Sequence, residues 1–457
     1  MRPLTVGLVL TITRAAFSAL AVETILPIIS DELGGVSLYG WVFSAYFLAS
    51  LASVIVAGGI ADQRGTLLPY AAGLGLFTVG LAIGAAAPTM PVLVASRLVQ
   101  GIGSGAIIAA TYASIARGYT ETERPRMFAI LSTAWVVPSI VGPATAAFIA
   151  TSFTWRLAFA GILPFAIVAA ALTVPALREL GAPEQPGART SRRDAVLVAV
   201  GGGLLLAGLT NSTLVLAIAL LIAGCVIGGP ALRRVTPPGT LTGRTGLGAA
   251  VLVRGLLTFA FFGTEAFLPL MLREARGLDP TTAGLALTTG ALTWTAGSWA
   301  YERLAPRLTS RAIITTSFAL VAIGAAGVLA VLLWPLPVEV AYVAWAVSGA
   351  GIGFGYSAIS VLVLRLAPPE RTGATGAAMQ VLDNLGTALG TGAGGAAIAI
   401  AVGRGLPIGT GIAVAIAIAI AGALAGLAVS RRLDASRPSV VGAVPPLTAE
   451  FARTQTE

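Results

Sequence analysis

The 457-residue sequence contains no histidine, no lysine and a single cysteine, and only 10% of its residues are charged. Without histidine there can be no histidine metal site and no triad with a histidine base, and without lysine there can be no Schiff base and no Walker-type phosphate loop. The lone Cys225 excludes an internal disulfide and a cysteine zinc site. We therefore expect that the protein is not an enzyme and holds no metal and no cofactor.

Apolar sequence is what the chain has in abundance, with 56% hydrophobic residues and a mean hydropathy of +0.90. This balance is typical of membrane proteins that cross the bilayer many times. The net charge of +9 could also indicate a nucleic-acid partner. However, the arginines lie in short segments between apolar runs, where the positive-inside rule explains them, so we expect no nucleic acid. The first run, 4–30, is too long for a signal peptide and is interpreted as an uncleaved span.

Apolar runs of roughly 18–28 residues predict an all-α integral membrane fold with about fourteen transmembrane helices. The Gly-rich seventh and eighth runs are the least distinct. The expected spans are 4–30, 37–59, 67–87, 91–116, 127–150, 156–177, 194–210, 213–230, 248–272, 282–300, 311–333, 338–364, 372–401 and 408–430.

The loop arginines orient these spans. With the N-terminus inside, the loops assigned to the cytoplasm hold most of the arginines, and the outer loops hold only Arg156, Arg273, Arg276 and Arg404. This asymmetry predicts a multi-pass protein of the plasma (inner) membrane with both termini in the cytoplasm, surrounded by membrane lipids.

The string Glu-x-x-Leu-Pro occurs twice, as Glu23–Pro27 in the first span and as Glu265–Pro269 in the ninth, each time near the outer end of the span. Counting from each copy gives six spans, two inserted spans and six more, which is a parallel repeat. We therefore expect four regions. They are an N-terminal six-helix bundle (1–177), cytoplasmic linkers with two extra helices (178–247), a C-terminal six-helix bundle (248–430) and a disordered cytoplasmic tail (431–457).

Three motifs follow one another on the expected spans. Gly58–Gly65 has the pattern G-x-x-x-D-x-x-G, Arg97–Gly105 has the pattern R-x-x-Q-G-x-G, and the fifth span carries Pro138 and Gly142-Pro143. Together they resemble the motifs of the major facilitator superfamily, and within it those of the fourteen-span drug:proton antiporter type. The resemblance implies two six-helix bundles in pseudo-repeat around a central cavity, with alternating access. It also implies gating roles for Gly58, Asp62, Arg64, Gly65, Pro138, Gly142 and Pro143.

Ionisable residues inside predicted spans are the candidates for proton coupling: Glu23, Arg97, Glu265 and Asp383. The first three fall about 9–11 Å below the outer surface at 1.5 Å per helical residue. Without histidine, a carboxylate is the plausible proton carrier, because burial and nearby charge change its proton affinity. The alternative is a structural ion pair or, for Asp383, a packing seam with an interhelical hydrogen bond. Arg14 and Arg254 lie nearer the cytoplasm, and we expect them to extend to the inner interface.

The substrate cavity is expected to be lined by aromatic and amide side chains of the same spans. Aromatic rings together with a carboxylate suit lipophilic cations, although each ring could instead face lipid. The candidates are Phe17, Trp41, Gln100, Trp135, Phe262, Trp294 and Gln380.

The sequence thus predicts a monomeric, proton-coupled secondary active exporter (antiporter) of small amphipathic or drug-like compounds. Two alternatives remain open. One is an exporter of a lipid or endogenous metabolite, and the other is a non-transporting membrane receptor or scaffold.

Overall fold

The computed structural model describes residues 3–120, 123, 127, 130, 131, 133–181, 192–211, 213–244, 246–368 and 372–433. Within these residues every regular element is helical and no strand occurs, which confirms the all-α expectation. Residues 434–457 of the expected disordered tail and most of the linker 178–193 lie outside the described residues.

The helices fall into three consecutive groups. The first group comprises α1 (Pro3–Leu33), the short η1 (Val36–Leu38), α2 (Tyr39–Arg64), α3 (Leu67–Ala85), α4 (Met90–Gly118), α6 (Val136–Ser152), α7 (Trp155–Ala160) and α8 (Leu163–Leu180). The inserted pair is α9 (Arg192–Thr210) and α10 (Leu214–Val235), followed by η2 (Thr240–Thr242). The last group comprises α11 (Leu247–Glu265), α12 (Leu268–Arg276), α13 (Pro280–Leu304), α14 (Ser310–Leu333), α15 (Glu339–Leu366), α16 (Thr372–Gly403) and α17 (Ile408–Ser430).

Twelve helical segments among the described residues are long and apolar enough to cross a membrane, counting α7–α8 and α11–α12 as one segment each. Two more helices occupy the remaining expected spans. α6 is shorter, with 17 residues, and α13 is more polar because six of its residues are threonine. The resulting fourteen segments agree with the predicted spans, except that α6 begins at Val136 rather than at 127, after a stretch that is only partly described.

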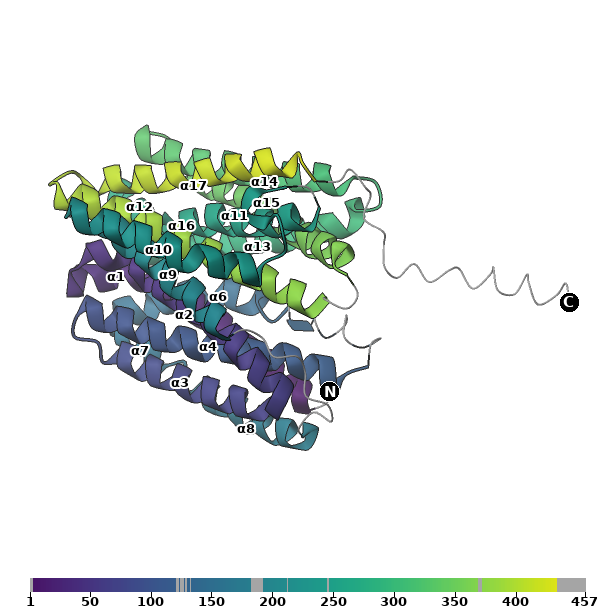
Figure 1. Ribbon diagram of the computed structural model, residues 1–457. Helices are drawn as coiled ribbons and strands as arrows, with labels where there is room; N and C mark the ends of the chain where they lie inside the picture. Colours follow the sequence, from purple (N-terminus) through teal and green to yellow (C-terminus); the bar gives the residue numbers. More distant parts are fainter. Residues whose placement is uncertain are drawn as a thin grey trace, which may run out of the picture.

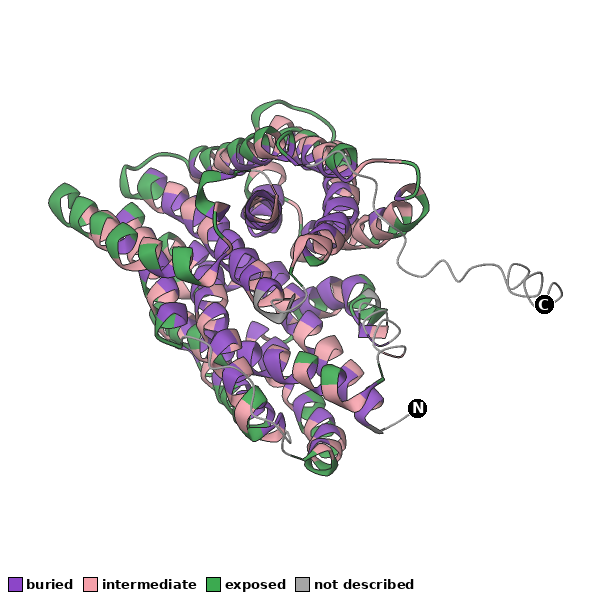
Figure 2. Cartoon of the chain, turned by 45° about the vertical axis from the view of Figure 1, so that its right-hand side comes forward, coloured by how far each residue is buried: buried purple, intermediate pink, exposed green. Residues whose placement is uncertain are grey.

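The helices form two bundles that meet along a central junction. In Figure 1 the group α1–α8 lies below the group α11–α17, and α9 and α10 lie across the line between them. We call the side where α1 begins the N-terminal face and the side where α1 ends the far face. The bundles diverge toward the N-terminal face (Figure 1). Figure 2 shows buried residues concentrated between the helices and exposed residues on the outer surfaces.

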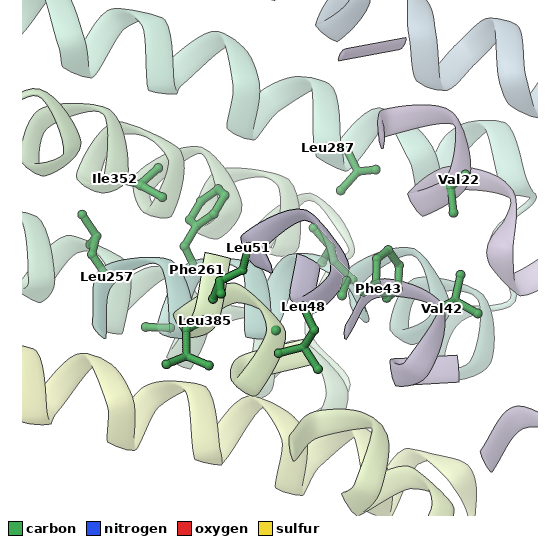
Figure 3. Packing of buried hydrophobic residues seen from close by; sticks show 14 of the residues in the cluster. Val22, Val42, Phe43, Leu48, Leu51, Leu257, Phe261, Leu287, Ile352 and Leu385 are labelled. Atoms are coloured by element: carbon green, nitrogen blue, oxygen red, sulfur yellow. The ribbon is translucent and has the colours of Figure 1, made fainter. Parts of the chain in front are cut away.

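Apolar side chains and close helix contacts hold the junction. Figure 3 shows buried residues of α1, α2, α11, α13, α15 and α16 gathered there, among them Phe43, Leu51 and Phe261. Nearer the far face, the Ser44 hydroxyl on α2 donates to the Ala388 carbonyl on α16 at 2.9 Å. An ion pair between Asp31 and Arg273, 2.7 Å long, joins α1 to α12 at the far face. These contacts fasten the two bundles together on the far side.

The two Glu-x-x-Leu-Pro copies differ in backbone structure. In the first copy, Pro27 lies inside the continuous helix α1. In the second copy, α11 ends at Glu265 and α12 restarts at Leu268, with Pro269 in its first turn. Proline is tolerated in the first turn of a helix because that position has no intrahelical N–H partner to lose. The repeat in sequence therefore gives a continuous helix in one bundle and a broken one in the other.

Candidate functional site

The first candidate site surrounds Glu23 on α1. Its side chain is buried, with 8% of its surface exposed, and its Oε2 atom has no hydrogen-bond partner. The cation that interacts with it electrostatically is Arg97 on α4, itself 3% exposed. A buried carboxylate without full hydrogen bonding is costly in a membrane-spanning helix, which makes it a candidate for function rather than packing.

Arg97 is held from three directions. Its Nε donates to the Val42 carbonyl at 3.3 Å, its Nη1 donates to Gln100 Oε1 at 2.7 Å, and its guanidinium lies 4.3 Å from the centre of the Tyr46 ring. Gln100 in turn donates to the Gly80 carbonyl at 3.2 Å. The expected motif on α4 thus forms one hydrogen-bonded unit, and Arg97 is fixed in the N-terminal bundle while it interacts with Glu23.

Glycine lets α4 approach its neighbours closely enough for this arrangement. A Cβ at Gly103 would lie 2.5 Å from the Phe77 amide nitrogen on α3, and one at Gly73 would lie 2.8 Å from the Gly103 carbonyl oxygen. Contacts this short exclude any side chain, so the small residues of the motif act in helix packing.

Glu265 lies on the other side of the junction. It is the last residue of α11, is 7% exposed, and interacts electrostatically with Glu23. Glu23 on α1 therefore interacts electrostatically with Arg97 on α4 and with Glu265 on α11, so the three residues come from three helices and from both bundles. Glu23 thus has an arginine in its electrostatic environment, whereas Glu265 lies at a helix break.

Asp383 on α16 belongs to a different cluster. Arg254 on α11 donates through Nε to Asp383 Oδ1 at 3.0 Å, and through Nη1 to the Tyr356 carbonyl at 2.9 Å and to Ser360 Oγ at 3.0 Å. The Tyr356 hydroxyl donates to Asp383 Oδ2 at 2.9 Å. The expectation that Arg254 extends to the interface is wrong: it is 2% exposed and pairs with Asp383. The pairing is not visible in the sequence, because Asp383 lies on another helix, 129 residues away.

Arg14 on α1 also contradicts its expected position at the interface. It is 2% exposed, its guanidinium lies 3.9 Å from the centre of the Phe77 ring, and none of its three side-chain nitrogens has a hydrogen-bond partner. The turns around it are crowded, with Thr11 hydrogen-bonded to the Tyr70 hydroxyl at 2.7 Å. Arg14 and Thr11 lie on the buried side of α1, whereas Ile12, Thr13 and Ala15 are only partly buried, so the guanidinium points into the bundle rather than to the surface.

The aromatic candidates separate into two sets. Phe262 and Trp294 lie 6.2 Å apart, and the Trp294 ring is 5.3 Å from that of Tyr356. Phe47 of the N-terminal bundle reaches this group, 6.3 Å from Phe262. Phe17, Trp41 and Gln380 are partly buried on other helices, and Trp135 is 46% exposed. An aromatic cluster thus crosses the junction beside the Arg254–Asp383 pair, and neither Phe47 nor Tyr356 was identified from the sequence.

The gating candidates lie at two places. At the N-terminal face, Asp62 and Arg64 are exposed in the last turn of α2, and the helix ends at Gly65, whose φ of 89° favours glycine. Gly58 lies one turn earlier, where an added Cβ would meet no atom within 4 Å. On α6, the remaining candidates Pro138, Gly142 and Pro143 are buried.

Comparison with known proteins agrees with this architecture. The model of the Major Facilitator Superfamily matches residues 7–391 and 250–450. A multidrug efflux pump, SdrM, of Staphylococcus aureus (strain N315) is 25% identical over 402 residues, which cover 84% of this chain and 87% of that protein. The methylenomycin A resistance protein of Streptomyces coelicolor is 27% identical over 362 residues, covering 77% and 75%.

Solved structures show the same fold at lower identity. An auto-inhibited peptide transporter of the POT family superposes with a TM-score of 0.68 and 16% identity, covering 94% of this chain and 96% of that chain. The nucleoside transporter NupG gives a TM-score of 0.64 and 14% identity, covering 93% and 99%. At these identities the likeness concerns the fold alone.

Proposed function

The chain belongs to the Major Facilitator Superfamily, and on this basis we propose that it is a proton-coupled exporter of small amphipathic, drug-like compounds. Its relatives include proteins named as a multidrug efflux pump and an antibiotic resistance protein. In this proposal the N-terminal face is cytoplasmic, residues 1–177 and 248–430 act as the two halves that rock against each other, and the protein works as a monomer.

The observation that carries the proposal is the buried Glu23 carboxylate, which interacts with a fixed arginine on one side and with a second acid across the junction. Arg97 belongs to the N-terminal bundle and Glu265 to the C-terminal bundle. Any rotation of one bundle against the other therefore changes the distance from Glu23 to Glu265 while the distance to Arg97 is kept. Such a change alters the electrostatic environment of the carboxylate, and hence its proton affinity, in step with the conformational cycle.

A proton taken up by Glu23 from one side and released to the other would drive export. One proton moving down a potential of 100 mV supplies about 2.3 kcal/mol, which sustains a gradient of about fiftyfold for a neutral substrate. The aromatic cluster of Phe47, Phe262 and Trp294 provides apolar faces at the junction, and Phe262 lies one helical turn before Glu265 on α11. Such a combination favours compounds with an aromatic or cationic group and a lipophilic body.

The test is export from proteoliposomes with an imposed pH gradient, using a panel of amphipathic dyes and drugs. Glu23→Gln should abolish the part of transport that depends on the gradient, because the amide cannot carry a proton. The matched control is Glu32→Gln on the same helix, where the carboxylate is half exposed and pairs with Arg156. Gradient-driven export by Glu23→Gln at the wild-type rate would overturn the assignment. Transport of lipids but of none of the dyes or drugs would favour the alternative, an exporter of a lipid.

A further inference from the structure

The inserted helix α9 packs against both bundles at once. Gly202 contacts Leu48 of α2 and Leu385 of α16: a Cβ added to Gly202 would lie 2.8 Å and 3.3 Å from their methyl carbons. Further along α9, Leu206 lies against Gly392 of α16, where an added Cβ would meet its methyl carbons at 2.5 Å. α9 therefore lies over the α2–α16 seam, one of the lines along which the two bundles meet.

Glycines make this position possible. On one side, a Cβ at Gly201 would lie 2.5 Å from Gly228 Cα, so α9 and α10 approach backbone to backbone. On the other side, Gly202 leaves room for the two seam leucines. Small residues thus face large ones on both sides of the contact, Gly202 against the two seam leucines and Leu206 against Gly392, so α9 packs closely on α2 and α16 at once.

α10 forms the outer layer of the hairpin. Its apolar side chains are strongly exposed, with Val215 at 79%, Leu214 at 72% and Val226 at 66%. In a membrane such a surface faces lipid. In contrast to this exposed surface, the side chains of the α2–α16 seam beneath the hairpin are buried, with Leu48 at 6% and Leu385 at 7% exposed.

The opposite seam, between α6 and α13, is different. The two helices touch where a Cβ on Gly284 of α13 would lie 3.5 Å from Pro143 Cβ of α6. On these two helices, toward the N-terminal side, Ile140 is 47% and Leu292 is 45% exposed. Among the described residues no inserted helix covers this seam as α9 covers the other one.

We propose that the α9–α10 hairpin is a lateral seal, which closes the α2–α16 seam to the bilayer and leaves the α6–α13 seam as the lateral route for amphipathic substrates dissolved in the membrane. The seal itself needs only the packing of α9, whereas the route rests on the proposed export function. The proposal gives the two inserted helices a role: they make a pseudo-symmetric transporter open to lipid on one side only.

The seal is tested by labelling the protein in proteoliposomes with a small apolar diazirine dissolved in the bilayer. Light converts the diazirine to a carbene that inserts into nearby C–H bonds, and mass spectrometry locates the labelled residues. We expect Ile140 and Leu292 to be labelled at least about sixfold more than Leu48 and Leu385, which is the ratio of their exposed fractions (45% against 7%). Equal labelling of the two seams would overturn the proposal.

A pair of hairpin variants separates sealing from general damage. Gly202→Leu places a side chain against both seam leucines and should raise the labelling of Leu48 and Leu385 severalfold. Gly229→Leu is the matched control, because an added Cβ there meets no atom within 4 Å. Both changes raise helix propensity similarly, so only the contact differs. Unchanged labelling of the seam in Gly202→Leu, with the variant folded, would contradict the seal.

The lateral route has its own readout. Leu292→Trp should raise the KM for a bilayer-partitioned dye with little change in kcat, whereas Val226→Trp on the lipid face of α10 should leave both unchanged. An unaltered KM in Leu292→Trp would overturn the route. Because carbene labelling requires no transport, loss of the export function with an intact labelling pattern would refute the proposed function and leave the seal in place.

Discussion

Replacing Asp383 by asparagine tests how much the buried ion pair with Arg254 contributes to the stability of the C-terminal bundle. The change keeps the shape of the side chain but removes the negative charge that faces Arg254 at 3.0 Å. Arg254 is 2% exposed and keeps its bonds to the Tyr356 carbonyl and to Ser360, but the asparagine offers it only a neutral amide oxygen in place of the carboxylate. A guanidinium left buried without its counter-charge costs about 3–5 kcal/mol, because it can neither reach water nor lose its proton.

The reverse change should cost less. In Arg254→Met the carboxyl group of Asp383 keeps its bond from the Tyr356 hydroxyl, and a carboxyl group can become neutral by binding a proton. Removing both charges in Arg254→Met with Asp383→Leu should restore most of the lost stability, since replacing a buried pair by apolar residues is often neutral. The order of stability is therefore wild type and double variant first, then Arg254→Met, then Asp383→Asn.

The assay is thermal unfolding of the detergent-solubilised protein, followed by the fluorescence of its tryptophans. For a folding unit of the length of residues 248–430, a loss of about 3–5 kcal/mol lowers the midpoint by roughly 6–20 °C. The double-mutant cycle should give a coupling energy of the same order. A midpoint of Asp383→Asn within about 2 °C of wild type would refute the buried-pair reasoning. Such a result, combined with lost export, would assign Asp383 to transport instead.

Two further predictions concern the ends of the helices. Asp31→Asn removes the exposed far-face pair with Arg273, in which the aspartate side chain is 57% exposed. Because such pairs contribute about 0.2–1 kcal/mol, the equilibrium constant for opening at the far face, measured from spin-label distances, should change less than about fivefold. A larger change would mean that the pair is desolvated. Asp279→Ala removes the N-cap of α13 and should cost about 1 kcal/mol at neutral pH. The hydrogen bond from Thr282 lowers the pKa of Asp279 from its ordinary value of 3.8. This stabilisation is therefore lost as pH falls through the folded pKa, and the unfolding midpoints of the two proteins should converge once the carboxylate is protonated. A constant difference down to a pH well below 3.8 would contradict this account.

The positions of the helices were predictable because hydrophobic length and turn residues are local properties. Even the two least distinct runs, 194–210 and 213–230, correspond to α9 and α10. The duplicated acids were also visible, since a repeat needs no knowledge of packing. The prediction for Arg254 was wrong because its partner Asp383 is 129 residues away in the sequence. The sequence pattern along one helix does not show which residue of another helix a given side chain will contact.

The sequence by itself determined that the chain is an all-helical membrane protein of about fourteen spans, because apolar length, arginine distribution and a repeated string are written in residue order. It also identified Glu23, Arg97 and Glu265 as ionisable residues that lie inside spans at a similar depth below the outer surface. Only the tertiary structure decided the partners: which acid each arginine meets, which rings cross the junction, and which seam the inserted helices cover. These pairings depend on how packed helices are rotated and how far apart they lie. Side-chain volume and glycine contacts between segments far apart in the chain set that rotation and separation.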